Sequence, residues 1–168
     1  MNSGEVDFMT KSRIYEQLKR DHENHRIRFA QIEKAGEDAD LRRSLFEKLR
    51  KELQAHAAAE EESLYATMLK RPDLRDDARH SVSEHKEIDD RLGELIDAEE
   101  DSEAWTTQFE GLRKRYFHHI EEEEREIFPA AGKALSDETE RRLALRFEER
   151  KPRELEAAER ERPGDERD

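Results

Sequence analysis

Two short runs of histidine and glutamate stand out in this chain of 168 residues. The first run is His56-x-x-x-Glu60 and the second is His119-x-x-x-Glu123. On a helix, residues four apart lie on one face with roughly 5–6 Å between their Cβ atoms, so each run could hold a cation. Imidazole nitrogens and carboxylate oxygens are ligands that iron, manganese and zinc accept.

The two runs belong to an internal duplication with an offset of 63 residues, the separation of His56 from His119. The same offset places Asp21-His22 on Glu84-His85, and in each copy 34 residues separate the two histidines. The offset also superimposes apolar residues, namely Phe46 on Phe109, Leu49 on Leu112 and Leu53 on Tyr116. Each half of the chain therefore carries one copy of the same histidine and glutamate unit.

Composition alone leaves open whether the chain is a charged helical bundle or a solvated chain, since 46% of residues are charged and 33% hydrophobic. The spacing of the apolar residues decides between them. Apolar residues recur every three or four positions over long stretches, which indicates amphipathic helices. Glycine, proline and β-branched residues are scarce, which also favours helix over sheet. We therefore predict an all-α fold.

The apolar pattern predicts four long helices separated by turns. They run from Ile14 to Gly36, from Leu41 to Lys70, from about Asp73 to the acidic stretch at 99–102, and from Trp105 to Gly132. We expect helix N-caps at Asp38 or Asp40, at Asp73 and at Ser102. Pro129 should kink the fourth helix or end it early.

The predicted architecture is an up-down-up-down four-helix bundle over residues 12–132. Residues 1–11 should be a flexible N-terminus. Residues 133–168 should form a C-terminal extra helix that begins near Ser136 and a charged tail beyond Pro152.

In such a bundle, residues equidistant from a turn return to the same height along the axis. The midpoints between successive members of the series His22, His56, His85 and His119 fall at 39, between 70 and 71, and at 102, each at a predicted turn. All four histidines should therefore share one interior layer. Glu60 and Glu123, one turn beyond their histidines, should join it.

Two buried carboxylates would cost several kcal/mol each if they stayed unpaired. No lysine or arginine lies on the inward stripes, so the neutralising charge we predict is a pair of metal ions. The alternative is a metal-free structural bundle in which the histidines are hydrogen-bonded core residues. A duplicated scaffold of that kind would keep its apolar stripes but would have no reason to keep charged groups inside.

Other polar residues are assigned roles outside the ligand set. For His25 we predict a solvated or capping role rather than a place next to the ligands, and for Tyr65 and Tyr116 plain packing rather than a hydrogen bond near the site. Asp21 and Glu84 should be exposed helix charges. Glu61 and Glu124 should face solvent or outer groups. His80 and His118 lie off the stripes and should be at the surface.

The whole pattern resembles the hemerythrin-like (HHE cation-binding) domain family over roughly residues 13–132. The motifs that carry the resemblance are Asp21-His22, His56-x-x-x-Glu60-Glu61, Glu84-His85, and His119-x-x-x-Glu123-Glu124 followed by Ile127-Phe128-Pro129. The resemblance implies a four-helix bundle around two iron ions, which form a non-haem centre bridged by carboxylates and an oxo or hydroxo oxygen. The implied ligands are His22, His56, Glu60, His85, His119 and Glu123. Imidazole and carboxylate ligands also accept manganese or zinc, which we rank below iron.

The chain departs in two respects from the hemerythrins that carry O2. Those have a second histidine one turn along the third helix, whereas the positions four from His85 are Ser81 and Asp89. Their last carboxylate ligand follows its histidine by five residues, whereas Glu123 follows His119 by four. Fewer histidines leave more positions for an exogenous ligand, and a more anionic set favours ferric iron. We therefore expect redox chemistry or sensing rather than simple O2 carriage.

Bulk charge and composition exclude several other classes. The net charge of −13 and pI of about 5.1 disfavour nucleic acid and anionic membranes as partners. The absence of cysteine excludes disulfides, thiolate zinc sites and iron–sulfur clusters. The sequence has neither a signal-peptide pattern nor a long apolar run, so we expect a cytoplasmic location.

The leading hypothesis for function is a di-iron protein that binds or reacts with O2, peroxide or NO. One alternative is an enzyme that detoxifies peroxide or NO at the same centre. Another is an iron or oxygen sensor, in which metal occupancy controls stability and the charged tail after Lys151 recruits a protein partner.

Overall fold

The computed structural model describes residues 13–98 and 102–164, and all regular structure within these ranges is helical. The all-α prediction is thereby confirmed. The flexible segment predicted at 1–11, the acidic turn at 99–101 and the last residues of the tail lie outside the described residues. Among the helices of the described ranges, none combines the length and apolar character that a membrane span requires.

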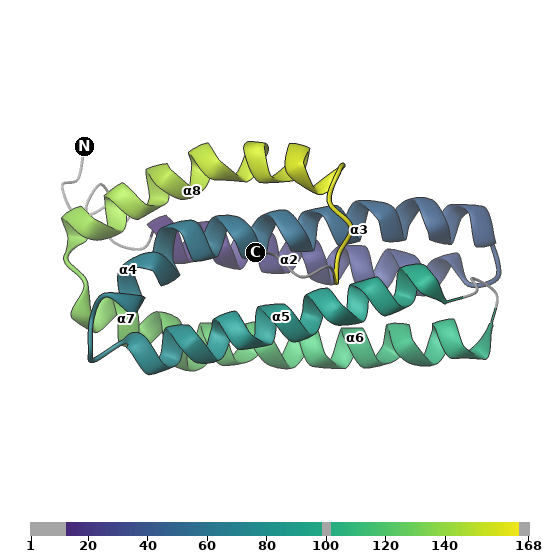
Figure 1. The fold of residues 1–168 in the computed structure, drawn as a ribbon, viewed down its shortest axis with the longest axis horizontal. Coiled ribbons are helices and arrows are strands. Elements are labelled where there is room, and N and C mark those ends of the chain that lie inside the picture. Colours follow the sequence, from purple (N-terminus) through teal and green to yellow (C-terminus); the bar gives the residue numbers. More distant parts are fainter. Residues whose placement is uncertain (1–12, 99–101, 165–168) are drawn as a thin grey trace, which may run out of the picture.

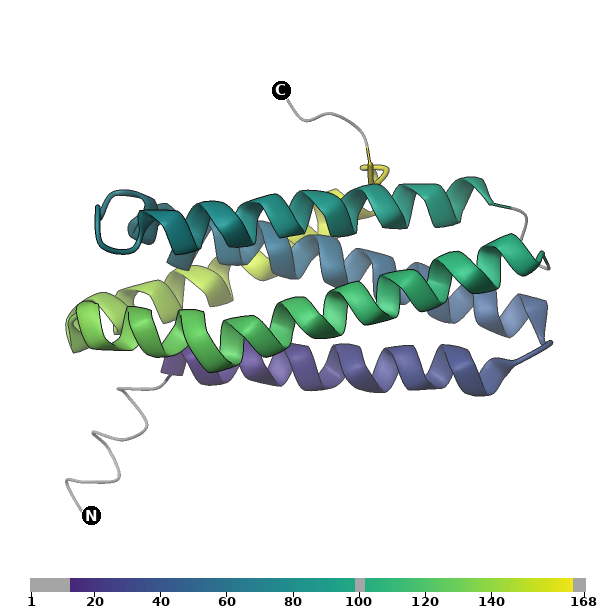
Figure 2. The same ribbon diagram turned by 90° about the horizontal axis from the view of Figure 1, so that it is seen from below.

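Four long helical stretches lie side by side in the described part of the chain (Figures 1 and 2). They are α2 (Arg13–Ala35), α3 (Ala39–Glu60) continued by η1 (Glu61–Tyr65) and α4 (Ala66–Leu69), α5 (Arg75–Asp97), and α6 (Glu103–Glu122) continued by η2 (Glu123–Ile127) and α7 (Phe128–Ala134). A further helix, α8 (Asp137–Ala158), lies along the outside of α3 (Figure 1).

Side-chain caps fix where most of these helices begin. The carboxylate of Asp38 accepts a hydrogen bond from the Leu41 N–H at 3.2 Å, and the hydroxyl of Ser102 accepts one from Trp105 at 3.1 Å. The cap predicted at Asp73 is wrong. Asp73 accepts instead from the guanidinium of Arg71 at 3.1 Å, and α5 starts at Arg75 without a side-chain cap.

Pro129 does not end the fourth stretch, so the early stop that we gave as one of its two possible effects is wrong. It lies in the first turn of α7, directly after η2, and the helix continues to Ala134.

Two apolar clusters fill the interior of the described bundle, one on each side of a polar layer. One contains Leu18, Leu64, Met68, Ile127 and Phe147, and the other contains Phe29, Leu49, Leu92, Leu112 and Ile120. Phe46, Leu49, Phe109 and Leu112, the residues paired by the 63-residue offset, are all buried as predicted. Leu41 and Ile96, near the ends of α3 and α5, are exposed.

The C-terminal part is more ordered than its charge suggested. Helix α8 runs through Pro152 to Ala158 and packs on α3 and α2. Residues 159–164 then cross toward α5 (Figure 1), where the Gly164 N–H donates to Asp89 at 2.7 Å. The buried guanidinium of Arg50 donates to the Ala158 carbonyl at 2.8 Å and so holds the crossing point on α3.

Candidate metal centre

The polar layer contains all six residues that the sequence singled out. His22 comes from α2, His56 and Glu60 from α3, His85 from α5, His119 from α6 and Glu123 from η2, and every one is buried. They form two overlapping groups, one of His22, His56 and Glu60 and one of Glu60, His85, His119 and Glu123. Within each group the ligand atoms lie within 4.8 Å of one another, so each group is compact enough for a metal ion.

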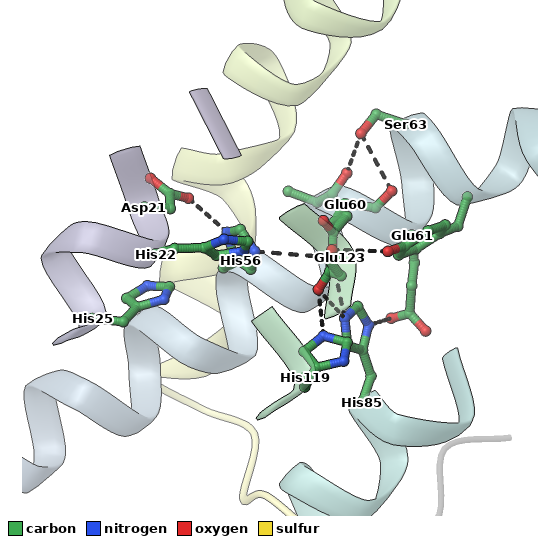
Figure 3. Close-up of polar contacts among 12 residues, drawn as sticks. Asp21, His22, His25, His56, Glu60, Glu61, Ser63, His85, His119 and Glu123 are labelled. Carbon is green, nitrogen blue, oxygen red and sulfur yellow. Dashed lines mark hydrogen bonds and ion pairs between the residues drawn. The ribbon is translucent and has the colours of Figure 1, made fainter. Parts of the chain in front are cut away.

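The two carboxylates lie between the two sets of imidazoles (Figure 3). Glu60 Oε1 lies 3.1 Å from His85 Nε2 and 3.9 Å from His56 Nε2, while Glu123 Oε1 pairs with His119 Nε2. The ring centroids of His22 and His56 are 5.1 Å apart, and those of His85 and His119 are 4.9 Å apart. Glu60 therefore faces an imidazole from each half of the chain.

Two further carboxylates orient the histidines from outside. Asp21 Oδ2 lies 2.8 Å from His56 Nδ1, and Glu84 Oε1 lies 2.9 Å from His119 Nδ1. Both acids are buried, so the prediction that they are exposed helix charges is wrong. The duplication contained the missed signal, because the offset of 63 residues relates Asp21 to Glu84 as it relates His56 to His119.

His22 and His85 also face outer carboxylates, which here belong to the residues that directly follow Glu60 and Glu123. His22 Nδ1 lies 3.3 Å from Glu124 Oε1, and His85 Nδ1 lies 3.7 Å from Glu61 Oε2. Glu61 and Glu124 therefore serve as outer groups, one of the two roles predicted for them. All four imidazoles turn Nδ1 outward toward a carboxylate. For His22, His56 and His119 the contact is a hydrogen bond, which fixes tautomer and ring orientation in metal-binding histidines.

Cationic side chains complete the outer layer. Lys151 of α8 pairs with Asp21 Oδ1, and Arg115 donates to Glu84 Oε2 at 2.6 Å. Arg26 donates to Glu124 Oε2 at 3.0 Å. We did not predict the role of Lys151, because it lies outside the duplicated halves and the 63-residue offset relates it to no residue of the repeat.

Two tyrosines and a further histidine make hydrogen bonds near the site. The Tyr65 hydroxyl donates to Glu123 Oε2 at 2.8 Å, and the Tyr116 hydroxyl lies 2.6 Å from His25 Nδ1. These contacts match the alternatives that we ranked lower, so the preferred predictions, plain packing for both tyrosines and a solvated or capping role for His25, are wrong. His25 lies nearly one turn after His22, which turns it toward the same interior. As predicted, His80 and His118 are exposed.

A π-helical turn accompanies the ligand glutamate in both halves. These turns are η1, directly after Glu60, and η2, which starts at Glu123. Such single π-turns within α-helices are frequent at functional sites. In η1, Ser63 donates its hydroxyl to the Ala59 carbonyl at 2.7 Å. We predicted continuous α-helix in this region and did not predict the π-helical turns.

Comparison with protein families decides the classification. The profile of the hemerythrin HHE cation-binding domain matches residues 13–131. The chain belongs to this hemerythrin family. The matched region runs from α2 into α7 and includes all six inward-facing residues, whereas α8 lies beyond it. Neither the comparison with curated proteins nor that with solved structures found a match.

Burial and neighbouring charges shift the pKa values of several residues in this hemerythrin-like centre. Burial, together with the negative charge of Glu123, raises the pKa of Glu60 well above its ordinary value. Burial alone would lower the pKa of His119, but the charge of Glu123 and its hydrogen bond raise it to about 9. Burial lowers the pKa of His56 to about 4. Without a metal, a proton on Glu60 neutralises its carboxylate, and a proton on His119 supplies positive charge beside Glu123.

The donor atoms fit metal ions. Within the described part of the chain, several buried atoms of the layer make no hydrogen bond, namely Nε2 of His22 and His56, both ring nitrogens of His85, and both carboxylate oxygens of Glu60. Leaving a buried polar atom unpaired costs about 1–3 kcal/mol, so this many together call for a ligand. Imidazole nitrogens with carboxylate oxygens form a suitable set for iron. The hemerythrin-like chain therefore contains a buried cluster able to hold a metal.

Proposed function

We propose that this chain binds two iron ions, and that the iron pair binds or reacts with O2, peroxide or NO. The position of Glu60 carries the proposal, because it belongs to both ligand groups and faces imidazoles of both. His22 and His56 would hold one ion, and His85 and His119 the other. Glu60 and Glu123 would bridge them.

The scaffold in this proposal is an up-down-up-down four-helix bundle over residues 12–132, with a C-terminal helix and charged tail over 133–168. The family match over residues 13–131 and the four adjacent helical stretches support it. A cytoplasmic location, the absence of nucleic-acid and membrane partners, and a protein partner for the charged tail are also proposed, on the basis of composition and net charge.

When bound, the iron pair would supply the electrons and the open coordination positions. The protein's own contribution is orientation and exclusion of water. The carboxylates of Asp21 and Glu84 hold the rings of His56 and His119 with Nε2 inward. The apolar clusters above and below the layer exclude water from these two sides.

Tyr65 places a buried hydroxyl next to the centre. Burial and the charge of Glu123 raise the pKa of Tyr65 well above its ordinary value, so the hydroxyl keeps its proton at neutral pH and acts as a hydrogen-bond donor. A neutral donor at this place favours detoxification of peroxide or NO as a second candidate function, because it can stabilise negative charge that develops on a ligand during reduction. The contact of Lys151 with Asp21 favours a third, since it links α8 to the ligand histidine His56 and would let a sensor transmit metal occupancy.

Optical spectroscopy of the iron-loaded protein tests the proposal. We expect an oxo-to-iron absorption in the oxidised protein and spectral changes on adding peroxide, azide or NO. His119→Ala should abolish both. His118→Ala is the matched control, because it removes the neighbouring, exposed imidazole from the same helix. An iron-loaded protein with no such absorption and no response to any of these ligands would refute the proposal.

A further inference from the structure

A cavity of about 340 Å³ lies between α3 and α5 and connects the surface with the metal centre. Two of its lining residues are the buried histidines His56 and His85, one from each ligand group. At the other end, Ala57 and Val82 are half-buried and Lys86 is exposed. A molecule in the cavity would therefore reach both halves of the centre from solvent.

One part of the cavity lining is apolar. It is formed by Leu53, Ile88 and Leu92, with the ring of Tyr116. All four side chains are buried. This part favours an apolar body over a hydrated ion or a sugar, since its only polar side-chain group is the Tyr116 hydroxyl, which already contacts His25.

The C-terminal segment 159–164 fixes two residues of the cavity lining. Gln54 donates to the Glu161 carbonyl at 3.3 Å, and Asp89 accepts from the Gly164 N–H at 2.7 Å. Gln54 belongs to α3 and Asp89 to α5, so the segment ties the two walls together. The cavity is therefore preformed, which lowers the ordering cost of binding.

The volume exceeds what a diatomic ligand needs. A water-sized molecule takes up roughly 30 Å³ in the liquid, about a tenth of the space present. Sites for small organic molecules begin at about 300 Å³. The cavity has the size of an organic ligand site.

We propose that this cavity binds an organic molecule with an apolar body and one oxygen-bearing head group, of the alcohol or hydroperoxide class. The head group lies toward His56 and His85, and the body lies along Leu53, Ile88 and Leu92. This inference rests on the proposed function in one respect: the head-group oxygen would lie at the metal centre only if the histidines hold metal ions. The binding itself rests on the shape and lining of the cavity.

Calorimetric titration of the iron-loaded, oxidised protein with 2-phenyl-2-propanol tests this proposal. The probe has an aromatic body and a hydroxyl head, and it is the alcohol that corresponds to cumene hydroperoxide. We expect saturable binding of one molecule per chain. Ala57→Leu fills the cavity near its mouth and should weaken binding on the order of tenfold or more, which the shift in Kd would show.

Ala30→Leu is the matched control, because it makes the same change at an exposed position of α2 and should leave the affinity within about twofold. Val82→Phe is a second filling variant in case Ala57→Leu fails to fold. No saturable binding to the wild type, or unchanged affinity in the folded filling variants, would overturn the proposal. Iron content is measured on the same samples. Iron without alcohol binding refutes only this inference, whereas alcohol binding without iron refutes only the proposed function.

Discussion

Asp21 accepts a hydrogen bond from His56, with 2.8 Å between Oδ2 and Nδ1. This contact leaves Nε2 of His56 as the nitrogen that faces the interior. Although burial alone would raise the pKa of Asp21, its hydrogen bond with His56 and the charge of Lys151 lower it, so the carboxylate stays ionised. Glu84 and His119 repeat the contact in the second half of the chain.

Removing this outer carboxylate should weaken metal binding without unfolding the bundle. For Asp21→Ala we predict a loss of about 10–100-fold in iron affinity, because the ring of His56 would lose its fixed tautomer and orientation. Anaerobic titration with ferrous iron measures the change. Glu23→Ala removes an exposed carboxylate two residues away and should leave the affinity unaltered. Equal affinities of the two variants would contradict the assigned role of Asp21.

Gly93 lets the C-terminal segment approach α5. A Cβ added at Gly93 would lie 2.8 Å from the Pro163 carbonyl oxygen, which is backbone and cannot turn away. Gly93→Ala should therefore release residues 159–164, even though alanine favours the helix by about 1 kcal/mol. Hydrogen exchange should become faster at the Gly164 amide.

Gly111→Ala is the control for this change. There the added Cβ would meet only the end of the Arg91 side chain, at 3.0 Å, which can move aside. Exchange at residues 159–164 should be unchanged in this variant. Slow exchange of the Gly164 amide in Gly93→Ala would show that the close approach does not hold the segment.

Metal binding should release protons. With its pKa raised to about 9, the metal-free His119 carries a proton at pH 7, and Glu60 also has a raised pKa. Ligation through His119 Nε2 requires the neutral ring, so at least one proton leaves at pH 7. Iron affinity should therefore decrease as the pH falls, since protons compete for the same atoms.

Calorimetry with ferrous iron in two buffers of different ionisation enthalpy counts the released protons. A difference in observed heat between the buffers is the expected result. Identical heats, or tighter binding at lower pH, would show that the metal-free layer does not hold these protons.

The duplication made much of the centre predictable. Its offset of 63 residues identified His22, His56, His85 and His119 as one layer, which the structure brings together with both glutamates. The outer acids Asp21 and Glu84 were misjudged because periodicity along one helix does not show which flank a neighbouring helix covers. Spacing within a helix predicts a face, but the partner of that face depends on tertiary packing.

Features outside the regular pattern could not be predicted in this way. The π-turns after the ligand glutamates change the helical phase, which a constant period of 3.6 residues does not include. Lys151 and the segment 159–164 lie beyond the duplicated halves, so no repeated position indicated their contacts. The high charge beyond Pro152 predicted only a charged tail, whereas Arg50 and Asp89 hydrogen-bond to residues 159–164.

Iron content per chain tests the central claim most directly. After anaerobic loading and removal of free iron, we predict two ions per wild-type chain. Glu60→Ala should lose both, because Glu60 belongs to both ligand groups, while Glu62→Ala, two residues later in η1, should keep both. One ion or none in the wild type, or two ions retained in Glu60→Ala, would contradict the account.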